Sequence, residues 1–378
     1  MADFKSTLFE QMIKDFAENE VKPLAQEVDE LERFPKETVE KMAKLGLMGI
    51  IVPKQYGGAG GDYRMYISAV EEISKACGTT GVILSAHTSL CAAPILEYGT
   101  EEQKVKYLPD LASGKKIGAF GLTEPNAGTD AANQQTTAVE MDDHYLLNGS
   151  KIFITNAGYA STYIIIAITG KGPKGPEMSA FIVESAFEGF SVGKKEKKMG
   201  IRGSSTCELI FENVKVPKEN LLGKRGDGFK IAMKTLDGGR IGIAAQALGI
   251  AEGALDATVA YVKSRKQFNR AIAQFQNTQF VLADLATRIA AAKALVYIAT
   301  DAKQNKLPTL SVNAAQAKLF AAETAMEVTT KCVQLHGGYG YTREYPVERM
   351  MRDAKITEIY EGTSEVQRMV ISGALLRK

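Results

Sequence analysis

The chain has 378 residues, of which 45% are hydrophobic, which is enough to bury a large core in two or three domains. Lys and Arg total 46 and Asp and Glu total 44, so the formal net charge is only +2. Without a dense basic run, this balance argues against a nucleic-acid partner.

The sequence also gives no sign of export or membrane insertion. Its first residues do not combine a basic segment with an apolar block, and uninterrupted apolar runs such as 163–168 are far shorter than the roughly 20 residues of a membrane span. The cysteines are widely scattered, which disfavours a disulfide framework and suits a reducing compartment; they are Cys77, Cys91, Cys207 and Cys332. We therefore expect a cytoplasmic protein.

Helical patterns dominate residues 1–113. Apolar residues recur at helical spacing from Leu8 to Phe16, and Thr7 with Glu10 predicts a capping box at the start of that helix. The further predicted helices are 35–46, which starts near Pro35 and stops at Gly46, 66–76, and 100–111 with a capping box of Thr100 and Gln103.

Short β-rich runs follow over residues 114–226. Tyr145 to Leu147 and Ser150 to Thr155 flank Asn148-Gly149, which predicts a hairpin with a type I′ turn. The other predicted strands are 163–169, 178–184, 190–193 and 207–216. Residues 227–378 return to long, Ala-rich helical patterns. We expect an α+β multidomain fold: a helical domain, a β-barrel-like domain and a helical bundle.

Several kinds of chemistry are disfavoured by the motifs. The one Gly-x-Gly-x-x-Gly match, at 170–175, carries Pro173 and is followed by Pro176, so it predicts a turn rather than a phosphate-binding helix start. The histidines and cysteines do not pair at the spacing that metal ligands usually show, which disfavours a metal site. The sequence contains neither the Gly-x-Ser-x-Gly motif of serine hydrolases nor a Walker loop. Cys332 and His336 are four apart on a predicted helix; we interpret them as a buried thiol beside a helix-end imidazole, with a nucleophile pair as the alternative.

Three stretches together resemble the acyl-CoA dehydrogenase family: Ala119 to Asp130 (AFGLTEPNAGTD), Leu335 to Tyr341 (LHGGYGY) and Arg352 to Thr363 (RDAKITEIYEGT). The likeness covers nearly the whole chain and is greatest for the short-chain, butyryl-CoA enzymes of anaerobic bacteria. It implies bound FAD, a short-chain acyl-CoA substrate, an electron-transfer flavoprotein partner and a homotetramer.

The resemblance also assigns residues to the flavin. Phe120, Leu122, Thr123 and Gly128 would line the cofactor, and Thr129 would lie near its diphosphate or the substrate thioester. Phe153 and Thr155 are two apart, so an aromatic and a hydroxyl share one face of the predicted strand, as the family places them against the flavin. Without the resemblance, the same pattern describes one packed face of a hairpin.

A second group resembles the adenosine and diphosphate side of the site, completed by a neighbouring subunit. Its members are Arg265, Gln267, Phe268, Phe275, Gln276, Gln334, Gly337 and Gly338, and the resemblance also places Thr363 and Glu365 at the cofactor. Asn269 stands where the family usually has Gly, which puts the tightness of that turn in doubt because Asn tolerates left-handed angles only second best. Taken alone, Arg265 is equally well explained as a charged helix end.

Glu361 occupies the position of the family's catalytic base. A carboxylate on a Gly-flanked turn can approach a substrate closely, and desolvation raises its basicity. By resemblance the backbone N–H of Glu361 stabilises the enolate-like oxygen, and Asp237, Arg240, Tyr360 and Gly362 contact substrate or steady the turn. Gly239 lies where some relatives carry their base. Taken alone, a Glu before Gly more often ends a helix in solvent.

The predicted activity is α,β-dehydrogenation of a short-chain acyl-CoA or its reversal. Three alternatives stay open on the same scaffold: an acyl-CoA oxidase, an acryloyl-type enoyl-CoA reductase, and a catalytically idle, flavin-loaded subunit.

Overall fold

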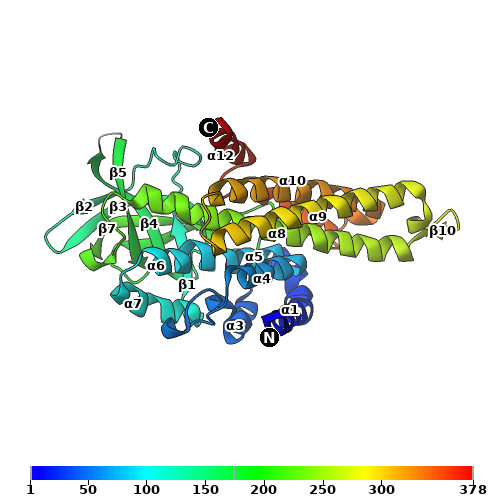
Figure 1. The fold of residues 1–378 in the computed structure, drawn as a ribbon, viewed down its shortest axis with the longest axis horizontal. Helices are drawn as coiled ribbons and strands as arrows, with labels where there is room; N and C mark the ends of the chain where they lie inside the picture. The colour runs from blue at the N-terminus through cyan, green and yellow to red at the C-terminus, as the bar shows by residue number, and fades with distance from the viewer. Residues whose placement is uncertain (1, 173–174, 377–378) are drawn as a thin grey trace.

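The computed structural model describes residues 2–172 and 175–376 as helices, then strands, then helices, which confirms the predicted α+β fold class (Figure 1). The first part contains α1 (Ala2–Phe16), η1 (Ala17–Val21), η2 (Lys22–Leu24), α2 (Ala25–Glu30), α3 (Lys36–Lys44), η3 (Leu47–Gly49), η4 (Lys54–Tyr56), α4 (Tyr63–Ala76), α5 (Gly78–Ser85), η5 (Ala86–Ala92), α6 (Ala93–Tyr98) and α7 (Glu101–Ala112).

One predicted capping box is confirmed and the other is wrong. At α7, the Thr100 hydroxyl accepts from the Gln103 N–H at 3.2 Å and the Gln103 side chain accepts from the Thr100 N–H at 3.0 Å. Thr7 does not cap α1, because residues 2–6 are already helical and carry the helix start upstream of the predicted position.

The continuous helical run over 78–98 is the one described segment that is long and apolar enough to cross a bilayer. In the structure, 94% of its most apolar window is packed inside the protein. This segment is therefore a buried core helix of the protein.

The middle part is an eight-stranded sheet. Its strands are β1 (Ile117–Gly121), β2 (Thr137–Glu140), β3 (His144–Thr155), β4 (Ala160–Gly172), β5 (Gly175–Glu184), β6 (Phe190–Lys195), β7 (Thr206–Pro217) and β8 (Leu221–Leu222), with η6 (Lys218–Asn220) before the last. The order is β6-β7-β3-β2-β4-β5-β8, with β1 also on β4. β1 and β2 are parallel to β4 and the other pairs are antiparallel.

The predicted hairpin at Asn148-Gly149 is wrong, because β3 runs straight through it and pairs with β7 on both sides. The dipeptide forms a bulge: Gly149 has φ 136°, and the Asn148 side chain accepts from the Asn213 N–H at 2.8 Å. The positive φ that Gly149 can adopt therefore serves a bulge within β3 rather than a turn between two strands, because contacts with other segments hold the chain there. The glycine-rich match does turn the chain, since Gly172 faces Gly175 across β4 and β5; Pro173 and Lys174 lie outside the described residues.

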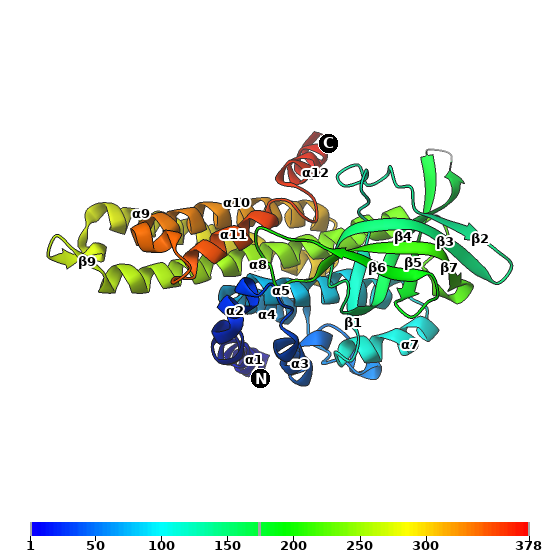
Figure 2. The same ribbon diagram turned by 180° about the vertical axis from the view of Figure 1, so that it is seen from behind.

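The last part is a helical bundle. It contains α8 (Gly228–Ser264), β9 (Lys266–Gln267), β10 (Arg270–Ala271), η7 (Ile272–Gln274), α9 (Gln276–Gln304), α10 (Leu310–His336), η8 (Gly337–Tyr341), α11 (Val347–Thr357) and α12 (Ser364–Leu376). Figures 1 and 2 show α8, α9 and α10 running side by side away from the sheet, with the β9–β10 hairpin at their far tip.

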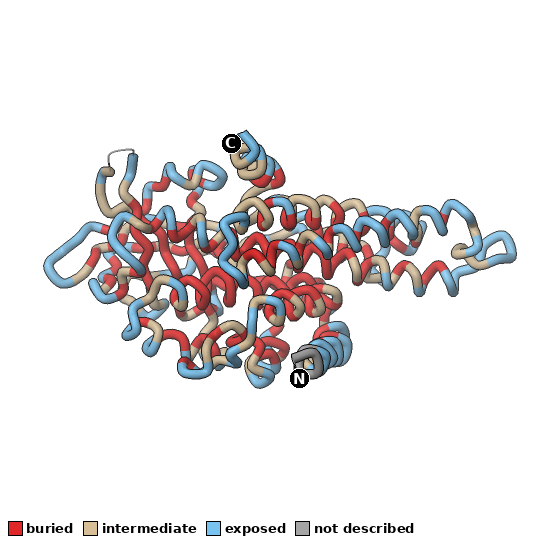
Figure 3. Tube along the Cα trace, viewed as in Figure 1, coloured by how far each residue is buried: buried red, intermediate tan, exposed pale blue. Residues whose placement is uncertain are grey.

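Burial is greatest where the three parts meet and least at the bundle tip (Figure 3). The Arg352 guanidinium of α11 binds Asp29 of α2 at 2.6 Å, and Asp353 accepts from the Ile201 N–H of the sheet part at 2.5 Å. These bonds fix the end of α11, and therefore the position of the segment that follows it.

We predict that Gly149→Ala lowers the temperature of unfolding, because an added Cβ would lie 2.6 Å from the Thr136 hydroxyl oxygen and 2.8 Å from the Thr136 Cα. Gly175→Ala is the matched control, since Gly175 has φ 135° but nothing within 4 Å of the added atom. Thermal unfolding of both variants separates steric overlap from backbone strain. Equal losses of stability would contradict the predicted overlap.

Candidate active site

The centre of the site is a chain reversal between α11 and α12. Glu361 has φ 53° and Gly362 has φ 96°, so two successive residues adopt left-handed angles. The Glu361 residue is partly exposed as a whole, yet its Oε2 atom is shielded from solvent and has no hydrogen-bond partner among the described residues. The reversal therefore carries a carboxyl oxygen that is shielded from water and accepts no hydrogen bond from the described residues.

Side chains from three helices bind the carbonyl groups of this reversal. Lys318 of α10 donates to the Gly362 carbonyl at 2.8 Å. Gln367 of α12 donates to the same carbonyl at 2.8 Å and to that of Glu361 at 3.3 Å, and Arg240 of α8 reaches the Glu361 carbonyl at 3.4 Å. The turn is thus held from several sides, which lets it keep an unfavourable backbone conformation.

Arg240 is itself held by an ion pair. Its Nη1 lies 2.9 Å from Asp237, and the second oxygen of Asp237 accepts from the Ser311 hydroxyl at 2.5 Å. The neighbouring Tyr360 hydroxyl binds the Gln246 side chain, which donates to the Gly78 carbonyl at 2.9 Å. The structure thus brings Asp237, Arg240, Tyr360, Glu361 and Gly362 together.

Gly239 makes room for the carboxyl group. A Cβ built on Gly239 would lie 1.9 Å from Glu361 Oε2 and 2.8 Å from a methyl carbon of Leu90. Because real atoms never approach so closely, the acid occupies the space that the missing side chain leaves on α8.

Burial raises the pKa of Glu361 to about 8, and the positive charges of Lys318 and Arg240 act in the opposite direction. A carboxyl group with this pKa exchanges its proton near neutral pH, which is the range that general acid–base chemistry requires.

The sheet part carries the second group of predicted site residues. Phe120 and Leu122 are buried at the end of β1, and the following loop is fixed to β3, since the Ile152 N–H donates to the Thr123 carbonyl at 2.9 Å. Lys151, which is fully buried, donates to the Leu122 carbonyl at 3.1 Å, to Glu124 at 2.7 Å and to Gln134 at 2.9 Å. A buried ion pair therefore shapes the loop.

Phe153 and Thr155 both avoid the buried face of β3, whereas Ile154 between them is buried. The strand is not regular there, because its pairing shifts between Lys151 and Ile154 and Phe153 has φ 58°. The Phe153 side chain is 59% exposed. The exposed Phe153 ring thus lies on β3 one residue after Ile152, which anchors the loop that follows β1.

Several residues predicted to contact the adenosine and diphosphate side of the cofactor lie in or beside the β9–β10 hairpin. Phe268 and Asn269 have φ 51° and 60°, so the β9–β10 turn has the two left-handed residues of a type I′ hairpin, and Asn269 adopts the angle usually reserved for Gly. This hairpin, with Arg265 and Gln267, lies at the bundle tip and Phe268 is 89% exposed. Phe275 and Gln276 follow it at the start of α9.

The remaining predicted residues lie at two helix ends and on one loop. Gln334, Gly337 and Gly338 lie at the end of α10, and Thr363 and Glu365 begin α12. Gly128 and Thr129 lie on an exposed loop after β1. Added Cβ atoms at Gly128, Gly337 and Gly338 would meet nothing within 4 Å.

Cys332 and His336 do not form a nucleophile pair. His336 Nδ1 lies 2.8 Å from the backbone carbonyl of Cys332, and burial raises the pKa of the thiol to about 11. The interpretation as a buried thiol beside a helix-end imidazole is confirmed.

The sequence reasoning missed Lys318, Gln367, Gln246 and the Lys151–Glu124 pair. Lys318 had a usable signal, because it is a lysine within the alanine-rich run Ala314 to Ala325 of a predicted helix. Gln246 and the Lys151–Glu124 pair join segments far apart in the sequence, which local patterns do not reveal. Gln367 binds carbonyls only five and six residues upstream, but no motif marks it.

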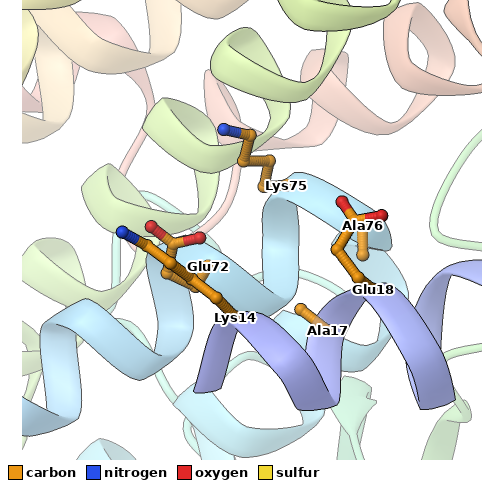
Figure 4. Close-up of a pocket in the computed structure, with 6 residues that line it drawn as sticks. All are labelled: Lys14, Ala17, Glu18, Glu72, Lys75 and Ala76. Carbon is orange, nitrogen blue, oxygen red and sulfur yellow. The ribbon is translucent and has the colours of Figure 1, made fainter. Parts of the chain in front are cut away.

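A surface cleft of about 310 Å³ lies between α1, η1 and α4, away from these residues. Figure 4 shows its lining, which is mixed in charge: Lys14, Ala17, Glu18, Glu72, Lys75 and Ala76. None of the site residues described above lines this cleft.

Comparisons with known proteins match the whole chain to one family. The acyl-CoA dehydrogenase N-terminal, middle and C-terminal domain models match residues 5–115, 119–214 and 226–376. A short-chain specific acyl-CoA dehydrogenase of Clostridium acetobutylicum is 65% identical over 98% of this chain and 97% of its own. A caffeyl-CoA reductase–Etf complex subunit of Acetobacterium woodii is 50% identical over 99% of each chain.

Solved structures agree. Butyryl-CoA dehydrogenase of Megasphaera elsdenii superposes with a TM-score of 0.96 at 54% identity over 98% of both chains. A chain from the study of the electron transferring flavoprotein of Acidaminococcus fermentans gives 0.96 at 57% identity and the same coverage. An acyl-CoA dehydrogenase of Bacillus anthracis complexed with FAD gives 0.94 at 37% identity, covering 99% of this chain and 67% of that one.

Three domain models in the order of the three structural parts, and identity of 65% over nearly the full length, show that the chain belongs to the acyl-CoA dehydrogenase family.

Proposed function

We propose that the protein catalyses the FAD-dependent α,β-dehydrogenation of short-chain acyl-CoA thioesters, such as butyryl-CoA to crotonyl-CoA, or the reverse. The observation that carries this proposal is the shielded, unpartnered Oε2 atom of Glu361 on a strained reversal. The short-chain and butyryl-CoA relatives support the substrate class.

Glu361 would remove the proton from the α-carbon. A base for a carbon acid must be poorly solvated and close to the substrate, and a raised pKa makes a carboxylate a stronger base. The Oε2 atom accepts no hydrogen bond from the described residues, so it is available to accept the proton. When bound, FAD supplies the acceptor for the hydride that leaves the β-carbon, so the thioester loses two hydrogens and becomes the enoyl product.

The backbone of the same residue would stabilise the negative charge that develops on the thioester oxygen. Within the described part of the chain, the Glu361 N–H donates no hydrogen bond to the protein. A positioned donor of this kind is typically worth about 3 kcal/mol in the transition state. Arg240 and Asp237 would steady the reversal and contact substrate, together with Tyr360, Gly362 and Thr129.

The residues near the sheet fit a flat aromatic cofactor. Phe153 offers an exposed ring, and the anchored loop at Leu122 and Thr123 offers backbone groups beside it. The open surroundings of Gly128, Gly337 and Gly338 allow close approach of a ligand. The residues that would hold FAD are Phe120, Leu122, Thr123, Gly128, Thr129, Phe153, Thr155, Gln334, Gly337, Gly338, Thr363 and Glu365.

A neighbouring subunit would complete the FAD site with Arg265, Gln267, Phe268, Phe275 and Gln276. This assignment is supported by the far tip position of the hairpin and by the 89% exposure of Phe268, a large apolar side chain that water disfavours. Arg265 forms no ion pair in the described part of the chain and contacts the Tyr339 ring at 5.5 Å. A homotetramer would provide such neighbours.

Electrons would pass to an electron-transfer flavoprotein, in keeping with the flavoprotein study that contains one of the most similar chains. We place the enzyme in the cytoplasm and divide it into three domains, 1–113, 114–226 and 227–378.

The reverse direction is the second candidate function, because a caffeyl-CoA reductase subunit is 50% identical to this chain. An oxidase would instead transfer its electrons to oxygen.

We predict that anaerobic addition of butyryl-CoA bleaches the FAD-loaded protein, and that Glu361→Gln keeps yellow FAD but loses turnover by about 10² to 10⁴, because the amide cannot accept the proton. Stopped-flow absorbance and steady-state rates measure the two effects. Full turnover by the Gln variant would remove Glu361 from the mechanism, and a wild-type protein that stays yellow would be an idle subunit.

We predict that kcat/KM for butyryl-CoA falls about tenfold per pH unit as the pH decreases below about 8, because the protonated Glu361 cannot act as a base. Above that pH the carboxylate predominates and the rate levels off. Initial rates across the range give the profile; a kcat/KM that does not change through this region would contradict the assigned pKa.

We predict that Gly239→Ala leaves the fold intact but lowers kcat by roughly 10²-fold, since the new methyl group displaces the flexible Glu361 carboxyl. Gly373→Ala on α12, with nothing within 4 Å of its added atom, is the control. Steady-state rates, with FAD absorbance as a check on folding, measure the effect. Wild-type kcat in the Gly239 variant would show that the acid acts from another position.

A further inference from the structure

Lys318 is a fully buried lysine in the alanine-rich middle of α10. Its ammonium group donates to the Gly362 carbonyl at 2.8 Å. In the described part of the chain, no carboxylate lies within ion-pair distance of it. An ammonium group buried without an ion pair is costly, and an apolar side chain of similar length would fill the same space at lower cost.

The other donors to the reversal do not share this property. The Arg240 charge is paired with Asp237 at 2.9 Å, and Gln367 is neutral. Lys318 therefore brings the one unpaired positive charge among the three side chains that hold the reversal, and Glu361 is the acid that the reversal carries.

We propose that Lys318 is a positioning residue for the reaction, whose ammonium group fixes the Gly362 carbonyl and whose positive charge favours the ionised form of Glu361 without touching the substrate. This inference rests on the proposed role of Glu361 as the base. It gives the buried lysine a function that its single hydrogen bond to a carbonyl does not explain.

Each group favours the charged form of the other. Burial lowers the pKa of Lys318 to about 8, and the charge of Glu361 opposes this shift. Burial raises the pKa of Glu361 to about 8, and among the charges that oppose this shift Lys318 is the strongest. Removing the ammonium charge thus leaves the desolvation of the carboxylate opposed by Arg240 alone, and a higher pH is then needed to ionise Glu361.

The other titratable groups facing this pair do not replace Lys318. Arg240 is committed to Asp237, and the Tyr66 and Tyr360 hydroxyls stay neutral because burial raises their pKa values. Glu358 and Glu365 act on Lys318 by favouring its ammonium form. The charged and titratable groups around Glu361 and Lys318 are therefore Tyr66, Asp237, Arg240, Glu358, Tyr360 and Glu365.

The test compares Lys318→Met and Lys318→Gln with wild type and with Lys331→Met, an exposed lysine on the same helix. We expect both Lys318 variants to bind FAD, to lose about ten- to 10²-fold in kcat, and to shift the acidic limb of kcat/KM for butyryl-CoA upward by about one pH unit or more. The Lys331 variant should match wild type in both quantities.

A second readout does not depend on turnover. The carboxylate band of Glu361 is followed by infrared difference spectroscopy against pH, with Glu361→Gln as the blank. The titration midpoint should rise in either Lys318 variant that folds. An unchanged midpoint and an unchanged acidic limb would overturn the proposal, even if kcat falls, because the lysine would then have only a packing role.

Glu361→Gln separates this inference from the function on which it rests. Retained turnover in that variant overturns both the proposed base and the role of Lys318. Lost turnover in Glu361→Gln, combined with wild-type pH behaviour in the Lys318 variants, overturns the role of Lys318 alone.

Discussion

Two part-buried carbonyl groups at the reversal between α11 and α12 take their hydrogen bonds from side chains on three helices, and the shape of the reversal depends on these bonds. A buried carbonyl left without a donor costs about 1 to 3 kcal/mol, and a non-glycine residue in the left-handed region costs about 1 to 2 kcal/mol more. Donors on α8, α10 and α12 offset these costs together. The reversal therefore keeps its shape only while three helices keep their relative positions.

The sheet side of the site is built on a different physical basis. There, the buried Lys151 of β3 donates hydrogen bonds to the Leu122 carbonyl, the Glu124 carboxylate and the Gln134 amide oxygen. These three bonds to one ammonium group hold the loop after β1. The bulge beside it turns Phe153 away from the core. The two arrangements share no secondary-structure element: the loop after β1 is held by a lysine of β3, and the reversal is held by side chains of three helices.

The sequence predicted what depends on neighbours along the chain. The helical, β, helical order, the α7 capping box and strands β4 to β7 follow from periodicity and local hydrogen bonding. Asn148-Gly149 misled the prediction because Asn213 on β7 and Thr136, just before β2, decide between a bulge and a turn. Thr7 misled it because helix propensity extended upstream. The resemblance supplied Glu361, but two partners of its turn, Lys318 and Arg240, are 44 and 121 residues away from the carbonyls they bind and share no motif with it.

The space shared by Gly239 and Glu361 constrains how enzymes with this fold can change over generations. Two acids seated there would lie closer than atoms can approach, and both could not ionise side by side. A lineage that moved its acid from the reversal to α8 would thus pass through a form with two carboxyl groups competing for one place, or through a form with none. Such an exchange therefore needs paired substitutions, because either single change leaves a site with too many acids or with none.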